Sequence, residues 1–397
     1  MTIFSTTRLL LASAALVTLS GPAWALDGQD LIAKINAAYL AGSGAIAAKT
    51  VEVNGTNVTL RDVTLTMTGT DGKSIAVGDV NLEDVAEEEG GAYLVKRIAF
   101  PDVNFTQEKA TISVKDLYLA GVHIPGDTTK NDLSSMMLYD EAHTGPVSVQ
   151  VEGKEVFSMA GFKGTSSISD DGATLSFEGA ARSIEADLAS VDDPKGKETI
   201  DALGLQKIDG DISLAGSWET TSGTITVDEY AFDFANIGKL SLSASLSGYT
   251  MDLVKQLQET ARSMQGNPAN EQAQQAAGLA MLGLAQQMSF ISADISFEDD
   301  GITKRGLAYG GKQQGMSGEQ LAGMIKGMAP MLLSQYKLGD LQNELSTAIN
   351  TFLDDPKNLS ISAAPENPVP FPMIMGAGMG APETLPKLLG VTVSANE

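Results

Sequence analysis

The chain has 397 residues, which is long enough for two or three domains that each bury a core. Its 26 basic and 50 acidic residues give a formal net charge of −24, which makes nucleic acid and anionic membrane surfaces poor partners. The sequence contains no cysteine, which excludes disulfides and thiolate metal sites, and its two histidines leave little material for a metal centre. With 43% hydrophobic residues, we expect a folded acidic protein without a cofactor or bound metal.

The first 25 residues have the pattern of a secretory signal peptide. Arg8 precedes an apolar stretch over residues 9–19, and the small residues Ala23 and Ala25 fit a cleavage site. The apolar stretch is shorter than the roughly 20 residues that span a bilayer, and no later stretch is apolar enough. We therefore expect cleavage after Ala25, a mature chain without a transmembrane anchor, and a periplasmic or secreted location.

The mature chain opens with helical spacing over residues 30–40 and then changes to a period of two over residues 50–125. An eight-residue unit recurs in this β-rich segment, with the pattern apolar, x, apolar, x, Asp, apolar, x, apolar. The acidic residues of its copies are Asp62, Asp79, Asp102, Asp116 and, in a looser copy, Glu229.

The apolar residues of this unit shift from odd to even positions after the acidic residue. A β-bulge inserts one residue in this way, and so does a tight corner between two short strands. Pro101 favours a corner in the copy at Asp102, since proline has no N–H for a central ladder. With either geometry, we expect Asp62, Asp79 and Asp116 to be exposed bend residues without a catalytic role.

Alternation resumes at residue 147 and continues to residue 246, interrupted by a polar helix or loop around residues 187–203. Residues 250–289 have helical periodicity, residues 291–297 and 302–309 read as a strand and its return strand, and two helices follow from Ser317 to residue 352. Short strands are expected at residues 359–363 and 390–394.

These patterns predict a signal peptide over residues 1–25 and three further segments over 26–145, 146–249 and 250–397. The fold class is β-dominated α+β. We expect an extended, strongly twisted and mostly antiparallel sheet, with a C-terminal helical region packed on it.

Eleven of the sixteen methionines lie between Met251 and Met379. Methionine side chains either fill an irregular core or line a surface that adapts to apolar partners. The apolar, Gly-rich stretch 371–379 is typical of a lid or an exposed apolar loop. If the helices cover the sheet only in part, these residues border a cleft for an acyl chain. The candidate ligand-binding residues are Met324, Met328, Met331, Phe371, Met373 and Met375.

Motifs for enzymatic chemistry are weak. The sequence has neither a Gly-x-Ser-x-Gly elbow nor a P-loop, and most carboxylate pairs precede Gly or Pro, which is typical of turns. Two alternatives remain open. One is a hydrolase that uses His123, His143 or a carboxylate pair, and the other is a secreted structural protein that binds Ca²⁺ at turns such as residues 298–300.

The N-terminal helix, the strands with the Asp-centred unit, and residues 240–246 leading into helices resemble uncharacterised proteobacterial periplasmic families. These are distantly similar to AsmA-type β-rich envelope proteins, some of which form grooves that handle lipids. The resemblance covers about residues 50–250 and transfers no site residue. The chain lacks the great length and retained anchor of the AsmA pattern. The resemblance implies a non-enzymatic envelope protein that holds a lipid, another amphiphile or an envelope protein partner against an apolar sheet face.

The first prediction concerns processing. Signal peptidase should cleave after Ala25, because Ala23 and Ala25 provide the small side chains that its pocket accepts. N-terminal sequencing of the exported protein should begin at Leu26, and a sequence beginning at Met1 would contradict the prediction.

Overall fold

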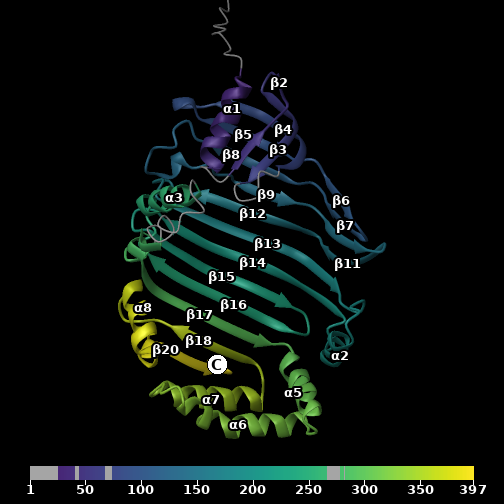
Figure 1. Cartoon of the computed structure of the whole chain (residues 1–397), viewed down its shortest axis with the longest axis vertical. Helices are drawn as coiled ribbons and strands as arrows, with labels where there is room; N and C mark the ends of the chain where they lie inside the picture. Colours follow the sequence, from purple (N-terminus) through teal and green to yellow (C-terminus); the bar gives the residue numbers. More distant parts are fainter. Residues whose placement is uncertain (1–25, 41–43, 68–73, 266–277, 281) are drawn as a thin grey trace, which may run out of the picture.

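The computed structural model of the chain describes residues 26–40, 44–67, 74–265, 278–280 and 282–397, so the expected cleavage site lies outside it. In these residues, twenty strands belong to one sheet, and the paired strands run antiparallel. Helices lie at the two ends of this open sheet and along its edges (Figure 1). The prediction of a β-dominated α+β fold with a large antiparallel sheet is confirmed.

The N-terminal end of the sheet packs against the first helix. Helix α1 (Gly28–Ile35) begins after Asp27, whose carboxylate accepts the N–H groups of Gln29 and Asp30, and a π-turn over residues 36–40 follows it. Leu31 of α1 is fully buried against the strands. These strands are β1 (Gly44–Ala47), β2 (Thr50–Asn54), β3 (Asn57–Met67), β4 (Ser74–Glu87), β5 (Tyr93–Ala99) and β8 (Tyr118–Ile124).

From β8 the ladder runs through neighbouring strands to the other end of the sheet. In order of pairing, these are β9 (Glu141–Thr144), β12 (Gly161–Ile168), β13 (Thr174–Asp187), β14 (Lys207–Glu219), β15 (Thr224–Phe234), β16 (Gly238–Ser247), β17 (Ser289–Asp299), β18 (Asn358–Ala363) and β20 (Val391–Ala395). Because β9 pairs with β12 and β16 pairs with β17, the three expected segments join in one sheet.

Four shorter strands leave this ladder on one side and rejoin it at β13. They are β6 (Val103–Gln107), β7 (Ala110–Val114), β10 (Val147–Val151) and β11 (Lys154–Met159). The small strand β19 (Val369–Pro370) pairs with the start of β17.

The structure contains both of the geometries that the eight-residue unit allows. A bulge occurs in β3, where the register with β4 shifts between Leu60 and Val63, and Asp62 takes a left-handed φ of 49°. A corner occurs at Asp102, between β5 and β6, and at Asp116, between β7 and β8. The side chains of Asp62, Asp79 and Asp116 are 66%, 44% and 58% exposed, so their expected exposure is confirmed.

A shared contact stabilises these bends. The left-handed residue leaves its N–H outside the ladder, and the side chain of a residue on a neighbouring strand or corner accepts it. The donor and acceptor residues are Asp62 and Asp79, Asp116 and Asp102, Ser183 and Asp211, and Asp84 and Asn57, at 2.8–3.1 Å.

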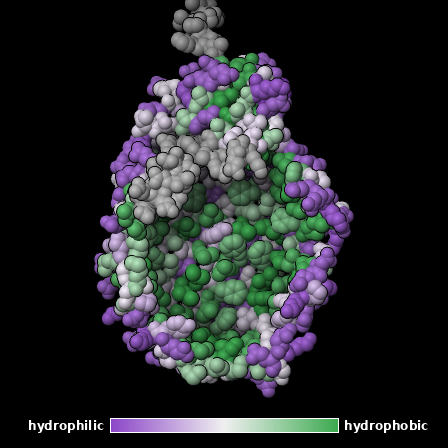
Figure 2. Space-filling view, in the orientation of Figure 1, coloured by the Kyte–Doolittle hydropathy of each residue, from purple (hydrophilic) through white to green (hydrophobic). Residues whose placement is uncertain are grey.

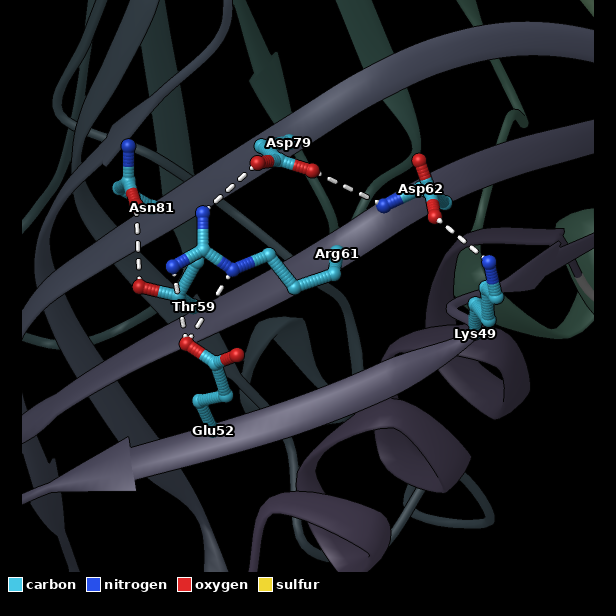
Figure 3. A network of polar contacts seen from close by, with 7 residues as sticks. All are labelled: Lys49, Glu52, Thr59, Arg61, Asp62, Asp79 and Asn81. Atoms are coloured by element: carbon cyan, nitrogen blue, oxygen red, sulfur yellow. Dashed lines mark hydrogen bonds and ion pairs between the residues drawn. The ribbon is translucent and has the colours of Figure 1, made fainter.

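The acceptor Asp79 also belongs to a wider network (Figure 3). Its carboxylate lies 2.7 Å from Nη1 of Arg61, and Nη2 of Arg61 lies 2.9 Å from Glu52 on β2. The backbone N–H of Asp62 and the Arg61 guanidinium together lower the pKa of Asp79. Asp79 on β4 is thus linked through Arg61 on β3 to Glu52 on β2, at the point where β3 bends.

The remaining helices lie outside the ladder, and α7 packs on β20 and β18 at its far end. None of the described helices combines the length and hydropathy needed to cross a membrane. The remaining helices are α2 (Pro194–Leu203), α3 (Met251–Gln265), α5 (Ile302–Gln313), α6 (Gly318–Ser334), α7 (Leu341–Asp354), α8 (Phe371–Gly380) and α9 (Leu385–Leu388). Short 3-10 turns lie at residues 89–91, 133–135 and 382–384.

Two expectations about the C-terminal region are wrong. Residues 302–309 form helix α5 and not a return strand, because the Asp299 carboxylate accepts the N–H groups of Gly301 and Thr303 and so begins a helical turn. Residues 371–379 form helix α8 and not a loop, although it contains three glycines. Pro372 in its first turn favours a helix start.

The bulge at Asp62 leads to the second prediction. Asp62→Asn should change the free energy of unfolding by no more than about 0.5 kcal/mol, since asparagine tolerates a left-handed backbone. Asp62→Val should cost about 1–2 kcal/mol, because a β-branched residue clashes there. Urea unfolding measures both, with Thr64→Val in the same strand as control. Equal stability of the Asn and Val variants would contradict the assigned backbone strain.

Candidate functional site

An unbroken row of apolar residues crosses the sheet. Residues directly opposite each other in antiparallel strands project from the same face, so the register defines which side chains share it. Following the pairs from β5 to β20 crosses eleven strands without meeting a charged residue. The row is Ile98, Leu119, Ala142, Gly164, Gly179, Leu214, Tyr230, Leu242, Ile295, Ile361 and Val393.

Much of this row remains accessible in the described residues. Tyr230, Ile295 and Ile361 are 39%, 45% and 41% exposed. In Figure 2 the same face is hollowed and mostly hydrophobic, with a hydrophilic rim along both sides. Contiguous apolar surface of this kind marks a binding site more often than a free surface. We refer to this face as the apolar sheet face.

The opposite face of the sheet is polar. The pairs Tyr118 with His143 and His143 with Lys163 place these three side chains on it. The Tyr118 hydroxyl donates to Glu141 at 2.7 Å, and Lys163 lies 2.9 Å from the same carboxylate. These contacts lower the pKa of Glu141. The arrangement is that of a solvated sheet face held by ion pairs.

Both histidines lie beside a carboxylate. The His143 ring stacks on Tyr118 at 4.7 Å, and its Nε2 lies 3.4 Å from Asp116. Nδ1 of His123 lies 3.3 Å from Glu88. Each imidazole is therefore paired with one carboxylate, and the hydrolase alternative stays a hypothesis.

The acidic turn proposed for Ca²⁺ has another use. Asp299 accepts the first N–H groups of α5, and Asp300 accepts the N–H of Asn236 at 2.6 Å. Within the described ranges, no three His, Cys, Asp or Glu side chains are grouped to hold a metal ion. A depression of about 630 Å³ is lined mainly by residues of β12, β13 and β14. Three of its charged side chains, Lys163, Arg182 and Glu229, each form an ion pair, with Glu141, Asp211 and Lys239 respectively.

An apolar cavity lies at the N-terminal end of the apolar sheet face. It has a volume of about 440 Å³, and its wall is formed by α1, β1, β3, β4, β5 and β8 with three residues between strands. Ile98 and Leu119 belong both to this cavity and to the apolar row. The cavity is lined by Ile35, Ile46, Leu60, Val63, Leu65, Val77, Val80, Leu82, Ile98, Phe100, Leu119, Met137 and Tyr139.

The exposure of the lining residues shows which side of the cavity is accessible. Leu60 and Leu82 are buried, Val77 and Leu119 are half-buried, and Tyr139 is 40% exposed. The carbonyl oxygen of Tyr139 accepts the hydroxyl of Ser166 on β12. The accessible rim therefore lies beside β12, where the apolar row passes from Ala142 on β9 to Gly164 on β12.

Helix α1 is held over the cavity by a polar contact at its edge. The Tyr93 hydroxyl donates to Asp30 at 2.7 Å, and Lys34 pairs with the same carboxylate. Lys34 and Tyr93 lower the pKa of Asp30, while burial and the neighbouring Asp30 raise the pKa of Tyr93. The contact keeps Ile35 in the cavity wall.

The six candidate residues lie on two helices that pack on different elements. Met324, Met328 and Met331 are 37–60% exposed on α6, which packs on α5 and α7. Phe371, Met373 and Met375 lie on α8, which packs beside β19. None of the six lines the cavity. Their role in ligand binding stays a prediction.

Sequence patterns did not reveal the cavity. Its valines, leucines and isoleucines occupy alternate strand positions like any core residue, and periodicity cannot distinguish a filled core from a hollow one. The small residues Ala142, Gly164 and Gly179 gave no signal either, because only the strand pairing brings them together.

Comparison with known proteins adds little about function. A family model described as an uncharacterized protein matches residues 231–396, from within β15 to the end of β20. No curated protein matches the chain. The matched segment includes the C-terminal part of the apolar sheet face and excludes the cavity.

The third prediction concerns acid sensitivity at α1. The lowered pKa of Asp30 means that its ion pair stabilises the fold above the ordinary aspartate value of about 3.9, and that this is lost as the pH falls through the lower folded value. Asp30→Asn should therefore unfold at lower urea concentration than wild type at pH 7, and the difference should shrink towards about pH 3. Glu83→Gln, at an exposed carboxylate of β4, is the control. A difference that does not depend on pH would contradict the role of the charge.

Proposed function

We propose that this protein is a non-enzymatic protein of the bacterial envelope that holds an amphiphile, with the hydrocarbon part on the apolar sheet face. The observation that carries the proposal is the apolar row, which continues across eleven strands and includes exposed Tyr230, Ile295 and Ile361. The signal-peptide pattern, which ends at Ala25, supports a periplasmic location.

Hydrocarbon burial provides enough free energy for such binding. Each methylene buried contributes about 0.8 kcal/mol, so ten contribute about 8 kcal/mol before the cost of ordering the ligand. This range corresponds to micromolar affinity. A protein partner on the same face is the competing occupant, and it would not need a free hydrocarbon chain.

The fourth prediction tests amphiphile binding directly. Delipidated protein titrated with a fluorescent fatty acid should show saturable binding at micromolar concentration. Leu214→Asp should weaken it by about tenfold, because it places a charge in the apolar row. Ser213→Asp introduces the same side chain on the other face of β14 and should bind as wild type.

Two outcomes would contradict the proposal. One is the absence of saturable binding at tens of micromolar, which would leave the protein-partner alternative. The other is wild-type affinity in the folded Leu214→Asp variant, which would place the ligand away from the apolar row. Native mass spectrometry of protein purified from its own periplasm would weigh a bound lipid directly.

A further inference from the structure

We infer that the apolar cavity under α1 binds the terminal, methyl end of a single hydrocarbon chain whose remainder lies on the apolar sheet face. This inference rests on the proposed function and specifies the position and orientation of the ligand. The cavity contains the end of the apolar row at Ile98 and Leu119, and it has an accessible rim beside β12.

The chemistry of the cavity selects hydrocarbon. The lining side chains are apolar apart from the hydroxyl of Tyr139, so the wall offers no charged partner to a headgroup. Its volume of about 440 Å³ lies within the range of small-molecule sites. A carboxylate or phosphate therefore stays outside, on the side of the accessible rim.

Small residues form the path from the cavity to the rest of the apolar sheet face. Ala142, Gly164 and Gly179 follow Leu119 in the row, and the two glycines carry no side chain. The ring of Phe162 lies over both, with ring atoms 3.1 Å and 3.3 Å from the positions that their Cβ atoms would occupy. Phe162 is 37% exposed, so its ring is the apolar surface that a ligand would meet over the two glycines.

The first experiment fills the cavity. Val77 on β4 is half-buried in its wall, and Val77→Phe adds bulk there, whereas Ala76→Phe adds the same ring at the exposed neighbouring position. Binding of palmitic acid to delipidated full-length protein is measured by isothermal titration calorimetry. Val77→Phe should weaken binding by about tenfold, and Ala76→Phe should leave it within about twofold of wild type.

The second experiment locates the chain end without altering the protein. A palmitic acid analogue with a diazirine at its methyl end is bound and photolysed, and the labelled peptides are identified by mass spectrometry. Label should appear in residues 58–65, 77–82, 98–100 or 137–139. A matched analogue with the diazirine next to the carboxyl group should label β12 to β14 instead, because a 16-carbon chain of about 20 Å spans about four strand spacings.

The outcomes separate the two proposals. If wild type binds palmitic acid but Val77→Phe binds equally well and the terminal diazirine labels β14 to β18, the cavity assignment is overturned and the proposed function stands. If wild type binds no palmitic acid, both are overturned. If Val77→Phe does not fold, the photolabelling of wild type decides by itself.

Discussion

The register of the antiparallel ladder is the constraint on which the rest of this structure depends. Side chains alternate between the two faces of a strand, so a slip of one residue in one strand would bring its apolar residues to the polar face. Between Leu119 and Val393 the ladder maintains the correct register through ten strands, and this produces one apolar and one polar face. Bulges at Asp62 and Glu229 insert one residue at the position where the apolar pattern shifts by one. The apolar residues on both sides of each bulge therefore project from the same face of the sheet.

Curvature of the sheet follows from the same bends. A bulge increases local twist, and a carboxylate that accepts the displaced N–H removes the cost of leaving it unpaired. Asp79 and Asp211 each perform this role and each also pairs with an arginine. Within the repeated unit, Asp79 and Asp102 accept the N–H groups that the bends displace. The sheet that contains these bends has the hollow apolar face seen in Figure 2.

Exposed apolar surface of this extent is a feature that folding alone does not require. Helix α7 packs against β20 at the end of the ladder, and α6 packs on α5 and α7, while Ile295 and Ile361 stay accessible. A ligand that covers this face would be stabilised by the same hydrophobic effect that forms the N-terminal core, because the two are continuous at Leu119. Most of the residues that line the cavity also belong to that core.

The sequence by itself determined the β-dominated class, the strand pattern, and the bends at Asp62, Asp79 and Asp116, because alternation and turn chemistry are local. It failed at residues 302–309 and 371–379, where Asp299 and Pro372 start helices in segments that alternation and glycine content had suggested to be strand and loop. Only the tertiary structure decided that apolar residues from β3, β5 and β8 surround an empty space and that the helices leave the sheet face open. Both depend on distances between segments far apart in the chain, and hydrophobic periodicity specifies which side of a strand is apolar but not what lies opposite it.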